Sequence, residues 1–318
     1  LGAARYFHHQ WPVPLRVNFG VRGNSMQQPQ KKDPNSMKHG KFKKTVMGLG
    51  CALAASGSLS AASFVLPGTQ MTVGVDESGG LIDAAFTAGI IPAWRPAVDY
   101  LRPGSPFQFY SIGASGQWLD AGYDPGNNFG ASTANTSAGS ILSATTTGTF
   151  GDLSFTQLLW FGVSDTTIRY EITFENTGPN ILTDVVYAVG LDPDQEFDLL
   201  GVYQTLNTIP NADTVLATGT TFGDWIQISS NDPLSHVPSV SFNWDTDPYL
   251  LFNTPPNDVG YNDSAINMAF WIGDMAPGQV VTFGYDISIG TVIPEPRDYA
   301  ILSGLGLLGL AAYRRFRK

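Results

Sequence analysis

The sequence predicts an all-β body, an antiparallel β-sandwich built as a single large unit or as two lobes, over residues 63–290. Residues 167–175 alternate strictly, with Ile168, Tyr170, Ile172 and Phe174 on one face and polar side chains on the other. Turn-forming Asn, Gly and Pro residues separate this segment from the next apolar one. Gly, Pro, Ser and Thr interrupt the body so often that we expect no amphipathic helix in it.

Several short segments of the body are rich in β-branched and aromatic residues, as strands are. The predicted strands are 150–163, 167–175, 181–189, 222–229, 266–272 and 280–289. The sequence Ala-Pro-Gly-Gln at 276–279 predicts a β-hairpin between the last two. Strands of this kind at short spacing indicate a sandwich.

The N-terminal part of the chain predicts an export signal. Residues 1–36 have a mixed composition and are interpreted as an upstream non-domain segment, so Met37 is the expected start. A lysine-rich stretch, an apolar run at 45–55 and small residues up to position 62 make 37–62 a signal peptide with a helical apolar core. The single cysteine, Cys51, lies in it, so the body has no thiol for a disulfide or a metal.

The C-terminal segment, residues 291–318, has three parts in order. Pro294, Glu295 and Pro296 form a stiff hinge, because two prolines fix φ and remove two N–H donors. The uncharged run 299–313 would rise about 22 Å as a helix, a marginal membrane anchor. A basic end with Arg314, Arg315 and Arg317 follows, which places the C-terminus in the cytoplasm.

This tripartite segment resembles the PEP-CTERM sorting signal of Gram-negative bacteria. The resemblance implies that an exosortase-type transpeptidase recognises the Pro-Glu-Pro tripeptide at the inner membrane and removes the tail. It also implies that the body is then delivered to the cell surface or to the extracellular polymer matrix. An ordinary tail anchor or a buried terminal helix is the alternative interpretation of the same residues.

Part of the body resembles a module of bacterial surface proteins. The match covers residues 170–178, 184–187 and the Asp-Pro-Asp stretch at 191–196, and 266–283 resembles the last hairpin of the same module. The resemblance implies an Ig-like or supersandwich-like architecture. It says little about activity, because one fold supports many functions.

The charge of the body excludes some partners. The chain has 27 acidic and 17 basic residues, but between positions 63 and 296 only Arg95, Arg102 and Arg169 are basic. A body this acidic repels nucleic acid and anionic lipid. It is suited to surroundings rich in salt or divalent cations, which screen its self-repulsion.

One acidic stretch is a candidate metal site. Asp192, Asp194, Glu196 and Asp198 stand at every second position, so an extended backbone would turn all four carboxylates to one side. Oxygen ligands of this kind suit Ca²⁺. Aspartates that cap turns in solvent are the alternative. A weaker candidate stretch contains Asp245, Asp247, Asp258 and Asp263.

The sequence gives little support to catalysis, so we expect no enzyme and assign no catalytic residue. His236 is the only histidine of the body and lies in a loop, where a solvated histidine is the usual finding. No nucleophile elbow, zinc cluster or phosphate loop is present. Glu171 and Glu175 would lie roughly 13 Å apart on one strand, too far for a glycosidase pair.

Tryptophans carry the main alternative function. Trp94, Trp118 and Trp244 lie beside Pro, Gly or Asp and are candidate sugar-stacking platforms, whereas Trp160 and Trp271 lie in apolar runs and are expected in the core. The preferred prediction is an exported structural or interaction protein of the cell surface or exopolysaccharide matrix. The alternative is a carbohydrate-binding or carbohydrate-active β-sandwich.

Overall fold

The computed structural model describes residues 63–123, 126–291 and 313. The described residues all belong to one compact unit, Ser56–Lys318. The upstream segment 1–36 and the predicted signal peptide 37–62 lie outside the described residues, and so does the sorting segment apart from Thr291 and Tyr313. Within the described ranges, no helix combines the length and apolar character needed to cross a membrane.

The described residues are mostly strands, which confirms the all-β prediction. The strands are β1 (Phe64–Pro67), β2 (Met71–Val75), β3 (Ile90–Pro92), β4 (Gln108–Ala114), β5 (Gln117–Tyr123), β6 (Gly126–Asn127), β7 (Ser132–Asn135), β8 (Ile141–Phe150), β9 (Leu153–Gly162), β10 (Thr167–Asn176), β11 (Leu182–Leu191), β12 (Thr205–Asn211), β13 (Thr214–Thr218), β14 (Asp224–Ser229), β15 (His236–Ser241), β16 (Gly260–Asn262), β17 (Ala265–Met275) and β18 (Val280–Thr291).

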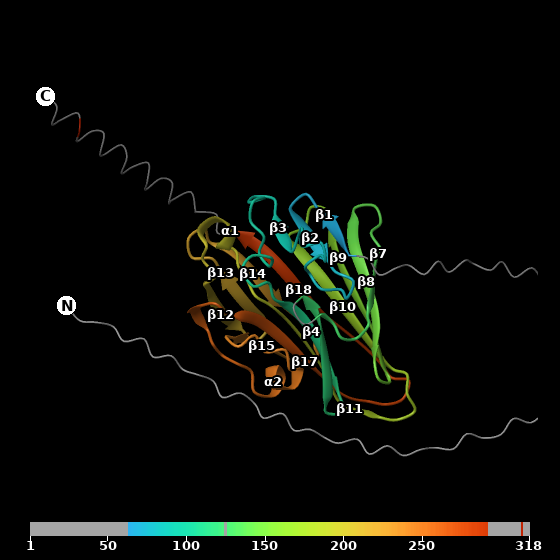
Figure 1. Ribbon diagram of the computed structural model, residues 1–318. Helices are drawn as coiled ribbons and strands as arrows, with labels where there is room; N and C mark the ends of the chain where they lie inside the picture. Colours follow the sequence, from blue (N-terminus) through green and yellow to red (C-terminus); the bar gives the residue numbers. More distant parts are fainter. Residues whose placement is uncertain (1–62, 124–125, 292–312, 314–318) are drawn as a thin grey trace, which may run out of the picture. The chain divides into compact units, whose positions relative to one another are not determined.

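These strands form three antiparallel sheets. The nine-stranded sheet has the order β16-β12-β13-β14-β18-β10-β9-β8-β7, and the six-stranded sheet has the order β15-β17-β11-β4-β5-β6. A small sheet holds β1, β2 and β3. In the nine-stranded sheet, β18 lies between β14 and β10 (Figure 1). It is the strand that connects β16, β12, β13 and β14 on one side with β10, β9, β8 and β7 on the other.

The two large sheets contact each other through one buried core. Phe174 of β10 and Phe283 of β18 lie 5.7 Å apart between ring centroids, and Phe283 is 5.5 Å from Tyr187 of β11 in the other sheet. Phe270 of β17 lies 4.9 Å from Phe283. Aromatic rings bury a large area each, so this cluster is a major source of stability.

Strand alternation decides which side chains enter the core. In β10 the predicted apolar face, Ile168 to Phe174, is buried, and the intervening residues are half-buried or exposed. The same alternation runs along β9, where Leu153, Phe155, Leu159 and Phe161 point inward. Residues 150–163, predicted as one strand, belong to two. Strand β8 ends at Phe150, a turn follows at Gly151 and Asp152, and β9 begins at Leu153.

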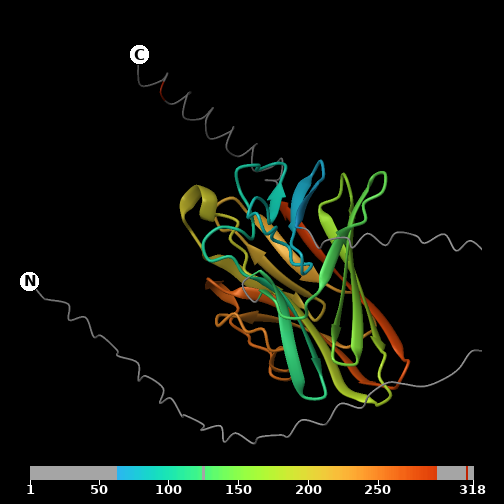
Figure 2. The same cartoon turned by 45° about the vertical axis from the view of Figure 1, so that its right-hand side comes forward.

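The hairpin predicted around 276–279 is wrong. Strand β17 pairs with β11 and β15, whereas β18 pairs with β10 and β14, so the turn carries the chain from one sheet to the other. The turn after β10 does the same. The two turns lie side by side at one end of the body (Figures 1 and 2), where the Gly278 N–H donates to the Asn176 carbonyl over 2.8 Å.

The body contains two short helices, and neither of them contradicts the expectation that it has no amphipathic helix. Helix α1 (Phe197–Leu200) has four residues, and helix α2 (Pro248–Asn253) has six. Neither is long enough to show an amphipathic period. Local signals set α2: Asp247 accepts hydrogen bonds from the Tyr249 and Leu250 N–H groups, and Pro248 opens the first turn.

Candidate functional site

Three neighbouring strands place one polar row on the outer face of the nine-stranded sheet. Arg169 of β10 lies directly opposite Trp160 of β9 and, on its other side, opposite Asp286 of β18. Their neighbours in sequence, Leu159, Tyr170 and Ile287, are buried in the core. Alternation therefore turns the row away from the six-stranded sheet, and all three of its side chains are half-buried.

This row lines a groove, hereafter the outer groove, with a volume of about 330 Å³. The opposite wall is the loop that follows β14. The outer groove thus combines one indole, one guanidinium, two carboxyl groups and short polar side chains; its principal lining residues are Trp160, Arg169, Ser229, Asn231, Asp232 and Asp286.

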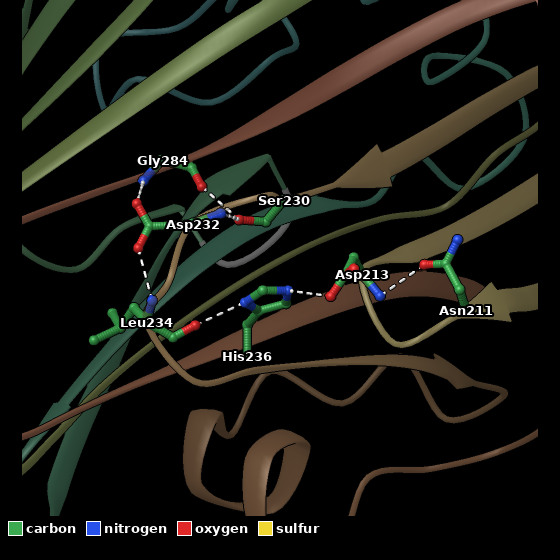
Figure 3. Close-up of polar contacts among 7 residues, drawn as sticks. All are labelled: Asn211, Asp213, Ser230, Asp232, Leu234, His236 and Gly284. Carbon is green, nitrogen blue, oxygen red and sulfur yellow. Dashed lines mark hydrogen bonds and ion pairs between the residues drawn. The ribbon is translucent and has the colours of Figure 1, made fainter.

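Hydrogen bonds hold the loop against the sheet (Figure 3). The Ser230 hydroxyl donates to the Gly284 carbonyl over 2.7 Å, and the Gly284 N–H donates to Asp232 Oδ2 over 3.1 Å. The Leu234 N–H donates to Asp232 Oδ1 over 2.9 Å. Both carboxylate oxygens of Asp232 are therefore engaged by the backbone, and this wall of the groove is built before any ligand arrives.

His236 extends the same network. The expectation that it lies in solvent, as loop histidines usually do, is therefore wrong. Its Nδ1 is 2.8 Å from the Leu234 carbonyl oxygen, and its Nε2 is 3.1 Å from Asp213 Oδ1 (Figure 3). The side chain is 8% exposed. Because both ring nitrogens face oxygen atoms of the protein, the imidazole braces the loop and has no nitrogen directed to a substrate.

Electrostatics within the outer groove centre on Arg169. Its Nη1 lies 2.7 Å from Asp165 Oδ2, and this hydrogen bond lowers the pKa of the Asp165 carboxyl. Burial raises the pKa of the Asp286 carboxyl, and the charge of Arg169 opposes that rise. The guanidinium thus bonds to Asp165, outside the groove lining, and its charge acts on Asp286 within the lining.

The three predicted platforms differ in their exposure. Trp118 of β5 is 36% exposed. Trp94 packs against the main core, and Trp244 packs against a smaller apolar cluster with its ring 6.2 Å from that of Phe107. The indole N–H groups of Trp94 and Trp244 are buried. Trp118 is therefore the most exposed of the three, and Trp94 and Trp244 are half-buried.

Trp160 was expected in the core, and that expectation is wrong because it rested on the apolar neighbours alone. The residues at 155, 159 and 161 enter the core, so the parity of the strand puts position 160 on the outer face. The expected core residue Trp271 is half-buried and stacks on Phe252, with the ring centroids 5.4 Å apart.

A second candidate site lies where two strands of the six-stranded sheet meet. Strand β11 ends at Leu191, which pairs with Ile266 near the start of β17. Asp192 and Asp194 follow the first strand and Asp263 precedes the second. One carboxylate oxygen of each lies within 4.8 Å of the others. We call these three residues the carboxylate cluster.

Burial governs the chemistry of this cluster. Asp192 and Asp194 are 4% and 1% exposed. Burial and the charge of Asp263 raise the pKa of Asp192 to about 8. Burial, with the charges of Asp192, Asp263 and Asp198, raises the pKa of Asp194 to about 9, and burial also raises the pKa of Asp263.

The structure does not bring all four predicted calcium ligands together. The chain turns into α1 after Asp194, so the alternation on which the prediction rested stops there. Glu196 Oε1 accepts from the Thr221 and Phe222 N–H groups, and Asp198 Oδ2 accepts from the Asp99 N–H. The third carboxylate beside Asp192 and Asp194 is instead that of Asp263. The sequence analysis had placed Asp263 in the weaker of the two candidate acidic stretches.

The remaining predicted residues fall elsewhere. Asp245 accepts from the Ser241 hydroxyl, and Asp258 accepts from the Phe242 N–H. The six residues predicted for sorting lie outside the described part of the chain: Pro294, Glu295, Pro296, Arg314, Arg315 and Arg317.

No protein-family model matches the chain, and no curated protein matches it. Solved structures overlap it only loosely. A heparan sulfate lyase from Pedobacter heparinus is 9% identical with a TM-score of 0.42, over 74% of this chain and 36% of the lyase. A bacterial glucoamylase complexed with acarbose is 12% identical with a TM-score of 0.47, over 77% of this chain and 34% of the enzyme.

A GH36 α-galactosidase from Geobacillus stearothermophilus is 9% identical with a TM-score of 0.40, over 73% of this chain and 40% of the enzyme. The chain thus spans little more than a third of the length of these proteins. With TM-scores below 0.5, the overlaps establish neither a fold family nor an activity for this chain.

Proposed function

We propose that this chain is an exported β-sandwich protein that binds carbohydrate without cleaving it, at the cell surface or in the exopolysaccharide matrix of a Gram-negative bacterium. The observation that carries the proposal is the row of Trp160, Arg169 and Asp286 along a groove whose opposite wall is fixed by hydrogen bonds. The facing core of the two large sheets supports the sandwich architecture.

The composition of the outer groove suits a sugar. An indole face stacks on the apolar face of a pyranose, and guanidinium and carboxylate groups bond its hydroxyls. Rigid strands hold these groups, so little conformational freedom is lost on binding. The volume of about 330 Å³ is at the lower end of ligand pockets, which fits one or two units of a longer polymer.

The state of the carboxyl groups favours binding over hydrolysis. A glycosidase commonly needs two carboxyl groups that act as acid and as base or nucleophile. In the outer groove, Asp232 uses both oxygens to accept backbone hydrogen bonds. Of the two carboxyl groups that line the groove, only Asp286 lies outside this hydrogen-bond network, opposite Arg169. One such carboxyl does not make the pair that hydrolysis commonly needs.

Export and sorting complete the proposal. The predicted signal peptide 37–62 would direct the chain across the inner membrane, and Pro294, Glu295 and Pro296 would present it to an exosortase-type transpeptidase. The acidic body argues against nucleic acid as a partner. Comparing the protein's size and cell fraction with and without the transpeptidase tests this part; an uncut chain in the cytosol would contradict it.

Trp160→Ala tests the binding site. We expect the purified full chain to bind a subset of bacterial polysaccharides on a glycan array, and Trp160→Ala to weaken that binding at least about ten-fold in calorimetric titration. Trp118→Ala is the matched control, because Trp118 is exposed on the other large sheet. Equal loss in both variants, or full binding by Trp160→Ala, would refute the outer groove as the site.

A further inference from the structure

We propose that Asp192, Asp194 and Asp263, the carboxylate cluster, bind one divalent cation, and that the cation is Ca²⁺. The site lies on the six-stranded sheet and is independent of the outer groove on the nine-stranded one.

The first argument is that three carboxylates converge with oxygens left over. Each residue has an Oδ1 atom that is buried and accepts no hydrogen bond from the protein. Asp192 and Asp194 are more than nine-tenths buried, so water replaces little of what is missing. A buried oxygen without a donor is costly, and three within 4.8 Å of one another also repel.

The second argument is that each arginine of the described body is engaged elsewhere. Arg95 pairs with Asp224, and Arg169 pairs with Asp165. Arg102 donates to the Phe86 carbonyl and lies over the Phe86 ring. The body has no lysine. No arginine of the described body is therefore left to pair with the cluster, so the charge that neutralises it, a proton or a metal cation, comes from solution.

The third argument is that the backbone prevents the carboxylates from separating. The Asp192 N–H donates to the Phe107 carbonyl and the Asp194 N–H donates to the Tyr100 carbonyl, both over 2.9 Å. Gly104 closes over the site: a Cβ atom there would lie 3.0 Å from Asp194 Oδ2. Strand pairing between β11 and β17 fixes the third ligand relative to the first two.

The fourth argument concerns the choice of cation. The cluster contains carboxylates and neither histidine nor cysteine, so it suits a hard cation better than zinc. Ca²⁺ binds oxygens at about 2.4 Å, so three oxygens within 4.8 Å of one another can all reach one such ion. Mg²⁺ keeps several waters and demands a tighter octahedron, which suits this buried site less well.

Ca²⁺ takes six to eight oxygen ligands, so oxygens beyond the three carboxylates, water among them, would complete the site. The half-buried side chain of Asp263 gives the cation a route from solvent.

The test is calcium titration of the purified full chain after chelator treatment. We expect a calorimetric binding signal and a Tm that rises with Ca²⁺ concentration, by roughly 5–10 °C at a hundred-fold excess over Kd. Mg²⁺ at the same concentration should give a smaller rise. A wild-type protein whose Tm and heat signal do not respond to Ca²⁺ overturns the proposal.

Variants separate a metal site from a structural hydrogen-bond cluster. Asp194→Asn and Asp263→Asn should abolish the Ca²⁺ response, while Glu171→Gln, an exposed acid on the other sheet, should keep it. Without calcium, Asp194→Asn should be at least as stable as the wild type, because an amide at this position cannot ionise beside the other two carboxyl groups. A calcium response that persists in Asp194→Asn, or a loss of stability without calcium in that variant, counts against the site.

Discussion

The hydroxyl groups of Tyr187 and Tyr285 lie 3.1 Å apart in the core, one from each large sheet. Tyr187 also donates to Gln157 Oε1, over 3.2 Å. Burial raises the pKa of both phenols well above the usual value, so both stay neutral. The hydrogen bond thus links the two sheets at a point that water does not reach.

Removing the Tyr187 hydroxyl should destabilise the fold. Tyr187→Phe leaves the Tyr285 hydroxyl and the Gln157 carbonyl oxygen short of a partner, so we expect a loss of about 1–3 kcal/mol in the free energy of unfolding. Urea unfolding measures it. Tyr261→Phe is the control, since Tyr261 is 56% exposed. Equal stability of the two variants would show that the link contributes nothing.

Phe283 should be among the most sensitive positions of the core. Its ring contacts aromatic rings of both sheets, and the residue is 2% exposed. Phe283→Ala therefore creates a cavity that both sheets border, and we expect a loss of about 3–5 kcal/mol. Val280→Ala, an exposed site on the same strand, should change stability little. Thermal unfolding of both variants decides the matter.

The ion pair between Arg95 and Asp224 should be costly to break from one side. The Asp224 side chain is fully buried, and Arg95 also lies over the Phe222 ring, 4.2 Å from its centroid. Arg95→Met leaves a buried carboxylate without its partner, so we expect a loss of about 3–5 kcal/mol. Adding Asp224→Asn should restore part of that loss. A double variant less stable than the sum of both single effects would contradict this account.

Asp286 predicts a pH dependence with a definite sign. Burial raises its folded pKa above the unfolded value of about 3.9, so the ionised folded form is disfavoured. Stability linked to this group is full below the unfolded pKa and falls as pH rises through the folded pKa. Asp286→Asn should therefore gain Tm relative to wild type between pH 4 and pH 7. A gain that is the same at both pH values would exclude the carboxyl as the cause.

Much of the fold could be predicted from local pattern. Alternation located β10 and its buried face, and apolar runs between turn residues located β11, β14, β17 and β18 within a few positions. Pattern could not show which sheet each strand joins, because a turn such as 276–279 serves equally within one sheet or between two. The wrong hairpin between β17 and β18 has this origin.

Only part of each candidate site could be predicted from the sequence, because each site also depends on contacts between strands that are distant in the chain. The sequence pointed to Asp192 and Asp194, but the third carboxylate, Asp263, is brought in by the pairing of β11 with β17, a contact between distant parts of the chain. Likewise, Trp160 meets Arg169 and Asp286 through register across three strands. The alternation within β9 could have placed that indole outside; its apolar neighbours concealed it.

The position of β18 has a consequence for how the protein matures. A chain that is synthesised from its N-terminus presents β18 after all the strands that it joins. Until residues 280–291 have emerged, β10 and β14 each lack the neighbour between them, and the large sheet exists at best as two separate halves with open edges. A polypeptide truncated before Val280 should therefore aggregate, whereas one truncated after Thr291 keeps every strand of the sheet.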